Sequence, residues 1–94
     1  MKKGIYKHFK GGYVKVLYIS YHSENLEEYV VYKKLYETPG SYGKNSIWIR
    51  PRKMFLENVI YNNKCVSRFK YMSIFNLLIE FIFNILKIVK TNKK

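Results

Sequence analysis

Aromatic rings and cations that recur along the predicted strands are the side chains of this sequence best suited to bind a ligand. An arginine guanidinium matches a carboxylate or phosphate with two hydrogen bonds, and aromatic rings stack on flat groups such as nucleobases. We therefore predict a face that binds an anionic or planar ligand. In the alternative interpretation, Trp48 anchors the core and Arg50 covers its ring as a cation–π partner. The residues of the predicted face are Tyr6, His8, Tyr32, Trp48, Arg50 and Arg68.

A catalytic site is harder to assemble from this sequence. The chain has no Asp, so a pair of carboxylates would have to come from its six Glu residues, and Glu24, Glu27 and Glu28 crowd one polar segment that is typical of a solvated turn. His8 and His22 could form an acid–base or metal pair with Glu24, but their spacing matches no known ligand motif. The sequence favours a non-enzymatic protein with no metal or cofactor site, and an enzyme is the distant alternative.

The charge balance favours acidic partners. The chain has eighteen Lys and Arg residues and six Glu residues, which gives a formal net charge of +12. Such a chain attracts nucleic acid or anionic lipid. A chain rich in Lys, Asn, Ile and Tyr also follows from an AT-rich genome, in which lysine is the ordinary solvated residue. A nucleic-acid-binding domain is therefore the second hypothesis for the function.

The single cysteine and the N-terminus predict where the protein works. Cys65 has no partner for an internal disulfide, which fits a reducing cytoplasm. Cations follow Met1 without an apolar stretch behind them, so no signal peptide is predicted. We expect a cytoplasmic protein that could also lie at the periphery of a membrane.

The predicted strands are arranged around the segment Ser46–Phe55. Ile47 and Ile49 alternate with Trp48 and Arg50, the period of a strand with two different faces. Pro51 cannot donate a hydrogen bond to a sheet, so the strand should end there. The next four residues have room for one helical turn before another strand begins.

The rest of residues 4–71 is predicted to form short strands with tight turns. Gly11-Gly12 and Asn62-Asn63 mark two of the turns, because these residues accept positive φ. In the longest strand we place Leu17 and Ile19 on one face and Val16 and Tyr18 on the other. Five or six such strands predict a mainly β fold, a small SH3-like barrel without unpaired edge strands. The predicted strands are residues 5–9, 13–22, 29–36, 47–50, 56–61 and 66–71.

From Met72 the period changes to that of an apolar, amphipathic helix that is followed by a basic tail. The polar positions Asn76, Glu80, Asn84 and Lys87 fall within an arc of roughly 90°, which we expect to face water. The predicted units are a β domain at residues 1–71, a helix at 72–90 and a tail at 91–94.

This helix is predicted to be an association element. Eighteen residues reach about 27 Å, close to the thickness of a bilayer core. Packing on the β domain, association with a second copy and contact of residues 72–89 with a membrane all remain open. The residues expected to form the contact are Leu78, Phe81, Ile82 and Ile85.

Several short blocks, in this order, resemble a bacterial family of unknown function, domain-of-unknown-function family 1653. The resemblance covers residues 4–71 and implies a compact, mostly β domain with no established activity. Asn25, Ser67 and the Arg52-Lys53 pair depart from the family pattern, and the C-terminal helix lies outside it. The blocks are Gly4-x-Tyr6-x-His8-Phe9-Lys10-Gly11, His22-Ser23-Glu24, Val30-Val31-Tyr32, Trp48-x-Arg50-Pro51-x-x-Met54-Phe55 and Arg68-Phe69.

Overall fold

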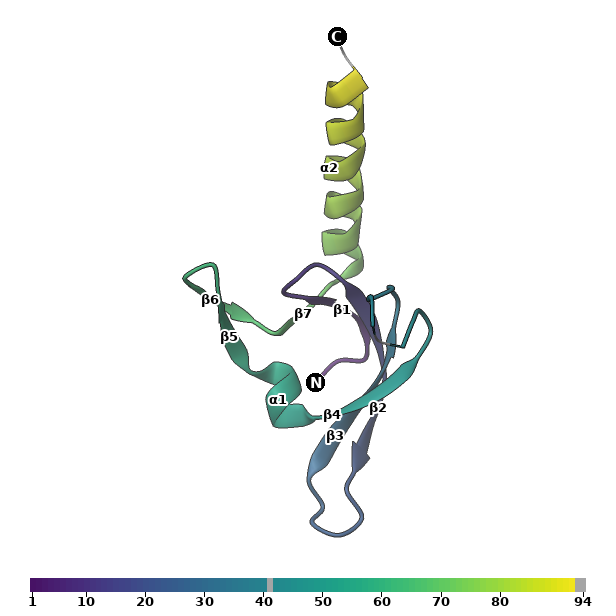
Figure 1. Cartoon of the computed structure of the whole chain (residues 1–94), viewed down its shortest axis with the longest axis vertical. Coiled ribbons are helices and arrows are strands. Elements are labelled where there is room, and N and C mark those ends of the chain that lie inside the picture. Colours follow the sequence, from purple (N-terminus) through teal and green to yellow (C-terminus); the bar gives the residue numbers. More distant parts are fainter. Residues whose placement is uncertain (41, 93–94) are drawn as a thin grey trace.

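Two antiparallel sheets and two helices make up the part of the chain that this computed structural model describes, residues 1–40 and 42–92. The larger sheet has the strand order β4-β3-β2-β1-β7, and β5 and β6 form a separate hairpin (Figure 1). The protein is therefore mainly β with a C-terminal helix, as predicted. The elements are β1 Gly4–His8, β2 Tyr13–Tyr21, β3 Glu28–Lys34, β4 Ile47–Pro51, α1 Arg52–Leu56, β5 Asn58–Tyr61, β6 Lys64–Ser67, β7 Phe69–Tyr71 and α2 Ile74–Asn92.

The two predicted tight turns are confirmed. Between β1 and β2, the His8 N–H donates to the Gly12 carbonyl at 2.7 Å, and Gly11 has a φ of 111°. Between β5 and β6, Asn62 and Asn63 have φ values of 51° and 62°. Two successive residues with positive φ give the turn the same twist as its strands, which keeps the hairpin tightly paired.

A β-bulge in β2 overturns the predicted faces of that strand. The register with β3 shifts between Val16 and Tyr18, so the alternation of sides is interrupted at Leu17. Before the bulge Val16 lies on the buried face, and after it Ile19 packs against the same core. Tyr18 instead lies on the opposite face with 62% of its surface exposed.

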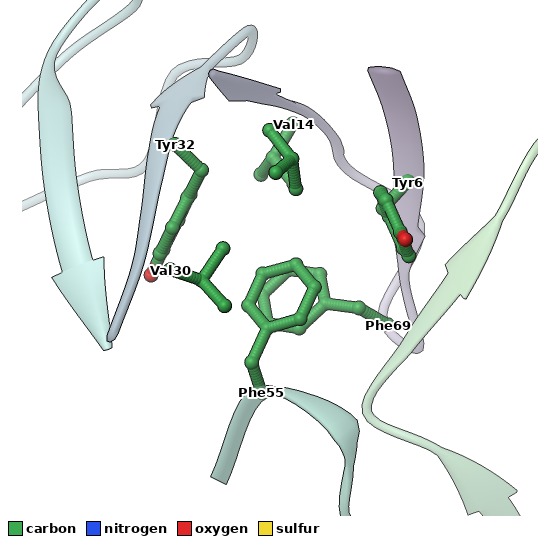
Figure 2. Close-up of a cluster of buried hydrophobic side chains, with 7 residues drawn as sticks. Tyr6, Val14, Val30, Tyr32, Phe55 and Phe69 are labelled. Atoms are coloured by element: carbon green, nitrogen blue, oxygen red, sulfur yellow. The ribbon is translucent and has the colours of Figure 1, made fainter. Parts of the chain in front are cut away.

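The core lies between the concave face of the large sheet and α1. Phe55 comes from α1, is completely buried, and stacks on Phe69 with ring centroids 4.2 Å apart and planes inclined by 4°. Figure 2 shows these two rings facing the valines and tyrosines of β1, β2 and β3. The helical turn after Pro51 therefore carries one large apolar side chain under the sheet. The buried cluster consists of Tyr6, Val14, Val16, Val30, Tyr32, Phe55 and Phe69.

The strand ladders of the described residues do not close into a barrel, so the predicted SH3-like barrel is not confirmed. The junction of β6 and β7 links the two sheets, because the Arg68 N–H donates to the Glu57 carbonyl and the Arg68 carbonyl accepts from the Phe9 N–H, both at 3.0 Å. On the other side, α1 separates β4 from β5. A helix satisfies its own backbone hydrogen bonds, so the ladder is interrupted there.

The predicted C-terminal helix is present, with Asn84 and Lys87 exposed as predicted, but Glu80 is oriented differently from the prediction. It extends away from the sheets along the long axis of the molecule (Figure 1). Glu80, expected in water, instead accepts hydrogen bonds from Lys7 Nζ at 2.7 Å and from the Tyr13 hydroxyl. The described residues contain no helix long and apolar enough to cross a bilayer.

Candidate functional site

A small pocket opens on the concave side of the large sheet, next to the core. It has a volume of about 140 Å³, less than the 300–1,000 Å³ of a typical drug-sized site, so it suits one small chemical group. β1, β2, β3, β4 and β7 and the segment after β3 all contribute side chains. We call it the basic pocket, and its lining residues are His8, Val14, Tyr32, Lys34, Tyr36, Trp48, Arg50 and Phe69.

Lys34 is the most unusual residue of the basic pocket. It is 7% exposed, although lysine is almost never buried without a partner. Its Nζ lies 3.4 Å from the Tyr42 carbonyl oxygen and 4.8 Å from the centroid of the Tyr36 ring. Among the described residues no carboxylate forms an ion pair with it. The amine therefore relies on one long hydrogen bond and on aromatic rings for its stabilisation.

His8 and Arg50 add two more basic groups. Burial, and after it the nearby charges of Arg50, Arg68 and Lys10, lower the pKa of His8. Its Nδ1 accepts a hydrogen bond from the Lys10 N–H at 3.1 Å, so the proton of the neutral ring lies on Nε2. Arg50 forms no ion pair with any described carboxylate. The lining has three bases and no acid, which gives a strongly positive potential.

Four aromatic rings, those of Tyr32, Tyr36, Trp48 and Phe69, line the basic pocket. The Trp48 Nε1–H donates to the Ser46 Oγ at 2.7 Å, which fixes the indole at the rim. Lys34, and not Arg50, is the cation over this indole, 5.8 Å from its centroid. Burial next to Tyr32 raises the pKa of Tyr36, so its hydroxyl stays neutral at physiological pH. A Cβ atom at Gly12 would lie 2.4 Å from the Tyr36 ring, so a glycine is needed there.

Four of the six predicted site residues come together in this pocket, and two lie elsewhere. Tyr6 is 4% exposed in the core, where its hydroxyl donates to the Lys2 carbonyl at 2.7 Å. Arg68 pairs with Glu57 at 2.5 Å and influences the pocket through its charge near His8. Its Nε is buried without a hydrogen-bond partner among the described residues. The four that line the pocket are His8, Tyr32, Trp48 and Arg50.

Reasoning from the sequence missed Lys34 and Tyr36. One signal for Lys34 was available, because it follows Val30 and Tyr32 at the period of a strand and so shares their face. Tyr36 continues the same alternation in the predicted strand 29–36, although in the structure it lies beyond the end of β3 at Lys34.

The residues considered for catalysis do not converge. His8 lies beside the start of β2 and His22 follows its end, so the strand separates them by roughly 30 Å. The His22 Nδ1 accepts a hydrogen bond from the Glu24 backbone N–H at 3.2 Å, which makes it part of a loop. Within the described residues, no three His, Cys, Asp or Glu side chains are placed to hold a metal ion.

The convex side of the sheet carries a second feature. We call it the outer face and define it by Lys15, Tyr18, Val31, Lys33 and Ile49. Lys15 and Lys33 are directly opposite each other in the β2–β3 ladder, an arrangement that is unfavourable for like charges. Neither forms an ion pair with a described carboxylate. Tyr18 and Ile49 are 62% and 65% exposed beside them.

Comparison with known proteins identifies a family that matches the chain and a solved structure that is similar to it. Residues 4–71 match the family described as a protein of unknown function, DUF1653. Among solved structures, the chain is similar to a crystal structure of a protein belonging to DUF1653 from Bordetella bronchiseptica, with 27% sequence identity and a TM-score of 0.66. That similarity covers 78% of this chain and 88% of the other. No curated protein matches the sequence.

Proposed function

The chain belongs to the DUF1653 family, and from this premise we propose that it is a non-enzymatic binding domain whose basic pocket holds a small anionic group. Phosphate or carboxylate has the size and charge for the pocket. The half-buried indole of Trp48 at the rim can stack on a flat moiety that carries the anion. The ligand class is therefore a planar molecule with a phosphate or carboxylate substituent.

The burial of Lys34 is the observation that carries this proposal. Removing an ammonium group from water without a counter-charge is costly, and here the group is 7% exposed with no carboxylate paired to it in the described chain. An anion in the pocket would contact Lys34 and Arg50 together and offset that cost. Arg50 supplies the bidentate contact that planar oxyanions prefer.

The test is a ligand screen with matched variants. Wild-type protein is screened by thermal shift against phosphate, simple carboxylates and mononucleotides, and any hit is titrated calorimetrically. We expect Arg50→Ala and Trp48→Ala to weaken binding of the hit by about tenfold or more. Arg52→Ala is the control, because Arg52 pairs with Glu28 outside the pocket. If both pocket variants stay folded and keep the wild-type ligand profile, the pocket is not the site.

The outer face favours a second candidate function, the binding of single-stranded nucleic acid. Tyr18 can stack on a base while Lys15 and Lys33 neutralise adjacent phosphates. Lys3 lies on the same face, with its Nζ 5.7 Å from the centroid of the Tyr18 ring. A polyanion would also relieve the repulsion between the two opposed lysines.

Fluorescence anisotropy with labelled oligo-dT and oligo-U at two salt concentrations tests this candidate. Lys15→Glu/Lys33→Glu should lower the affinity by about tenfold or more and make the salt dependence less steep. Lys53→Glu/Lys64→Glu has the same charge change on exposed residues elsewhere and should retain more affinity. If wild type does not bind at low salt, or if both double variants lose the same affinity, the outer face is not a nucleic-acid site.

A relationship to SH3-like barrels is a proposal about the fold. Its support is the backbone contact of Arg68 with both Glu57 and Phe9, which carries hydrogen bonding from the hairpin to the large sheet. Amide hydrogen exchange can test it. Protection that continues from β7 through the hairpin would favour a barrel-like closure, and rapid exchange throughout the hairpin would contradict it.

A further inference from the structure

The helix α2 exposes far more apolar surface than a monomeric protein normally carries. Between Ile74 and Val89, every large apolar side chain except Leu77 and Ile79 is exposed, with fractions from 43% at Ile85 to 86% at Ile74. Contiguous apolar patches of this extent mark sites of association with a partner or a membrane.

The base of α2 is fixed to the β domain through a polar side chain. Glu80 binds Lys7 and Tyr13 of the β domain, and the Ser73 Oγ accepts from the Asn76 N–H at 3.1 Å as an N-terminal cap. The hydrogen bond from Lys7 lowers the pKa of Glu80, so this anchor stays ionised at neutral pH. Glu80 thus faces the β domain, while the part of the helix beyond it projects away from the sheets (Figure 1), with residues 81–90 all exposed.

The width of the apolar side argues against one neighbouring helix as its cover. At 100° per residue, the apolar positions from Ile74 to Val89 occupy an arc of roughly 240°. A helix that packs against one neighbour needs an apolar stripe of little more than 100°. A second copy that pairs through α2 would therefore leave more than half of the arc in water, whereas a helix that enters the boundary of headgroups and acyl chains contacts lipid over a wider arc.

Charge also favours a lipid surface over a second copy of the chain as the partner of α2. The only carboxylate of α2 is Glu80, which is already paired, while Lys87 and Lys90 lie near its far end. Two copies would bring chains of +12 together, and their helices would add further lysines to the same contact. Anionic lipid headgroups instead attract those lysines while the acyl chains receive the apolar arc.

We propose that α2 binds peripherally to the surface of an anionic lipid bilayer. In this arrangement Phe81, Ile82 and Ile85 enter the acyl boundary, and Asn84 and Lys87 remain among the headgroups. The β domain is held on the water side through the Glu80 contacts. The site is separate from the basic pocket, so either proposal can fail without the other.

Vesicle flotation of the full chain tests the proposal. Vesicles of phosphatidylcholine alone are compared with vesicles that also contain phosphatidylglycerol. We expect about tenfold more protein to float with the anionic vesicles. Phe81→Ser/Ile85→Ser should abolish flotation, and Lys87→Glu/Lys90→Glu should remove the preference for anionic lipid. Ile47→Ser/Ile49→Ser removes two similarly exposed apolar side chains from β4 and should float like wild type.

Other results would overturn the proposal. Wild type that stays in the lipid-free fraction, or a Phe81→Ser/Ile85→Ser variant that floats normally, contradicts it directly. If light scattering shows oligomers that this variant disrupts while wild type ignores vesicles, a second copy covers α2. Circular dichroism confirms that each variant is folded. Arg50→Ala should float like wild type, which separates this result from the behaviour of the basic pocket.

Discussion

At the scale of single residues, the molecule places a lysine where its sequence position alone would suggest a core side chain. Lys34 continues the inward-facing row of Val30 and Tyr32, and the sheet buries it almost as completely. The aromatic rings of Tyr36 and Trp48 partly replace water around the amine. The anion proposed for the basic pocket would offset the folding energy that this burial costs.

Replacing Lys34 should separate stability from binding. In a buffer without binding anions, Lys34→Met should raise the free energy of unfolding by about 1–2 kcal/mol, because an apolar chain of similar length fills the site without a buried charge. The same variant should lose any thermal stabilisation by the pocket ligand. Urea denaturation measures the first effect, and Lys33→Met on the outer face is the matched control. A large loss of stability would mean that the aromatic contacts fully compensate the buried charge.

His8 should make anion binding depend on pH. Its pKa is lowered in the free protein, so the ring is neutral there at pH 7 and takes up a proton only below its usual range near 6.5. A bound anion favours the protonated ring, so affinity should rise as the pH falls through that range, by up to about tenfold per pH unit. Titration calorimetry at several pH values measures the change. His8→Gln should make the affinity nearly independent of pH. If the affinity of this variant depends on pH as strongly as that of wild type, another group takes up the proton.

The same shift sets the sign of the effect of His8 on stability. Because the unfolded chain binds the proton more readily than the folded one, the stability contribution of His8 is present above pH 6.5. It is lost as the pH falls toward the lowered pKa of the folded protein. Acid should therefore weaken the ligand-free fold while it strengthens anion binding.

At the scale of elements, α1 is the piece that completes the core. It is five residues long and directly follows Pro51, the last residue of β4. Proline has no N–H group to donate to a strand ladder. Its contribution to packing is concentrated in Phe55, which stacks on Phe69 and contacts Tyr6 edge-to-face, with ring centroids 5.3 Å apart. A single helical turn has little stability of its own, so tertiary packing must hold it in place.

Truncating Phe55 should therefore be costly. We expect Phe55→Ala to lower the free energy of unfolding by about 3–5 kcal/mol, and Phe55→Leu to lower it by roughly 1–2 kcal/mol. Met54→Ala, at a neighbouring position that is 44% exposed, should change it by less than about 0.5 kcal/mol. Urea unfolding followed by tryptophan fluorescence gives the three values. Equal effects at the two positions would show that α1 is not a core element.

At the scale of the whole molecule, the chain separates into a β domain and a projecting rod. The molecule extends 61 × 30 × 29 Å, and α2, with 19 residues at about 1.5 Å each, accounts for roughly half of its length (Figure 1). The family match ends at Tyr71, before the rod begins. Met72 nevertheless belongs to the β domain, because it is 5% exposed and its N–H donates to the Ile5 carbonyl at 2.9 Å.

A chain of residues 1–73 should fold without α2. Such a truncation keeps Met72 in place. It removes the hydrogen bond from Tyr13 to Glu80 and the ion pair between Lys7 and Glu80, whose side chains are 35% and 31% exposed, and such an ion pair contributes about 1 kcal/mol or less. We expect a β-type circular dichroism spectrum with the helical signal reduced, and no association with vesicles or with itself. A truncation after Tyr71 is the comparison, and the loss of Met72 should make it less stable. If residues 1–73 are unfolded, α2 is part of the folding unit.

The sequence by itself determined the local features of this protein. The alternation around Trp48, the stop at Pro51, the turn at Asn62-Asn63 and the change of period after Met72 each depend on neighbours along the chain, so they could be predicted. The family resemblance over residues 4–71 was equally visible, because it rests on short blocks of sequence.

Only the tertiary structure decided what each side of a strand or helix contacts. The bulge at Leu17 moved Tyr18 from the predicted apolar partners to the outer face, because register is set by the paired strand and not by the strand's own alternation. Glu80 turned toward the protein because Lys7 and Tyr13, far away in the chain, present the donors that its carboxylate needs. The basic pocket depends on five strands meeting on one concave side. Long-range pairing of this kind leaves no local signal, and it decided which groups surround Lys34.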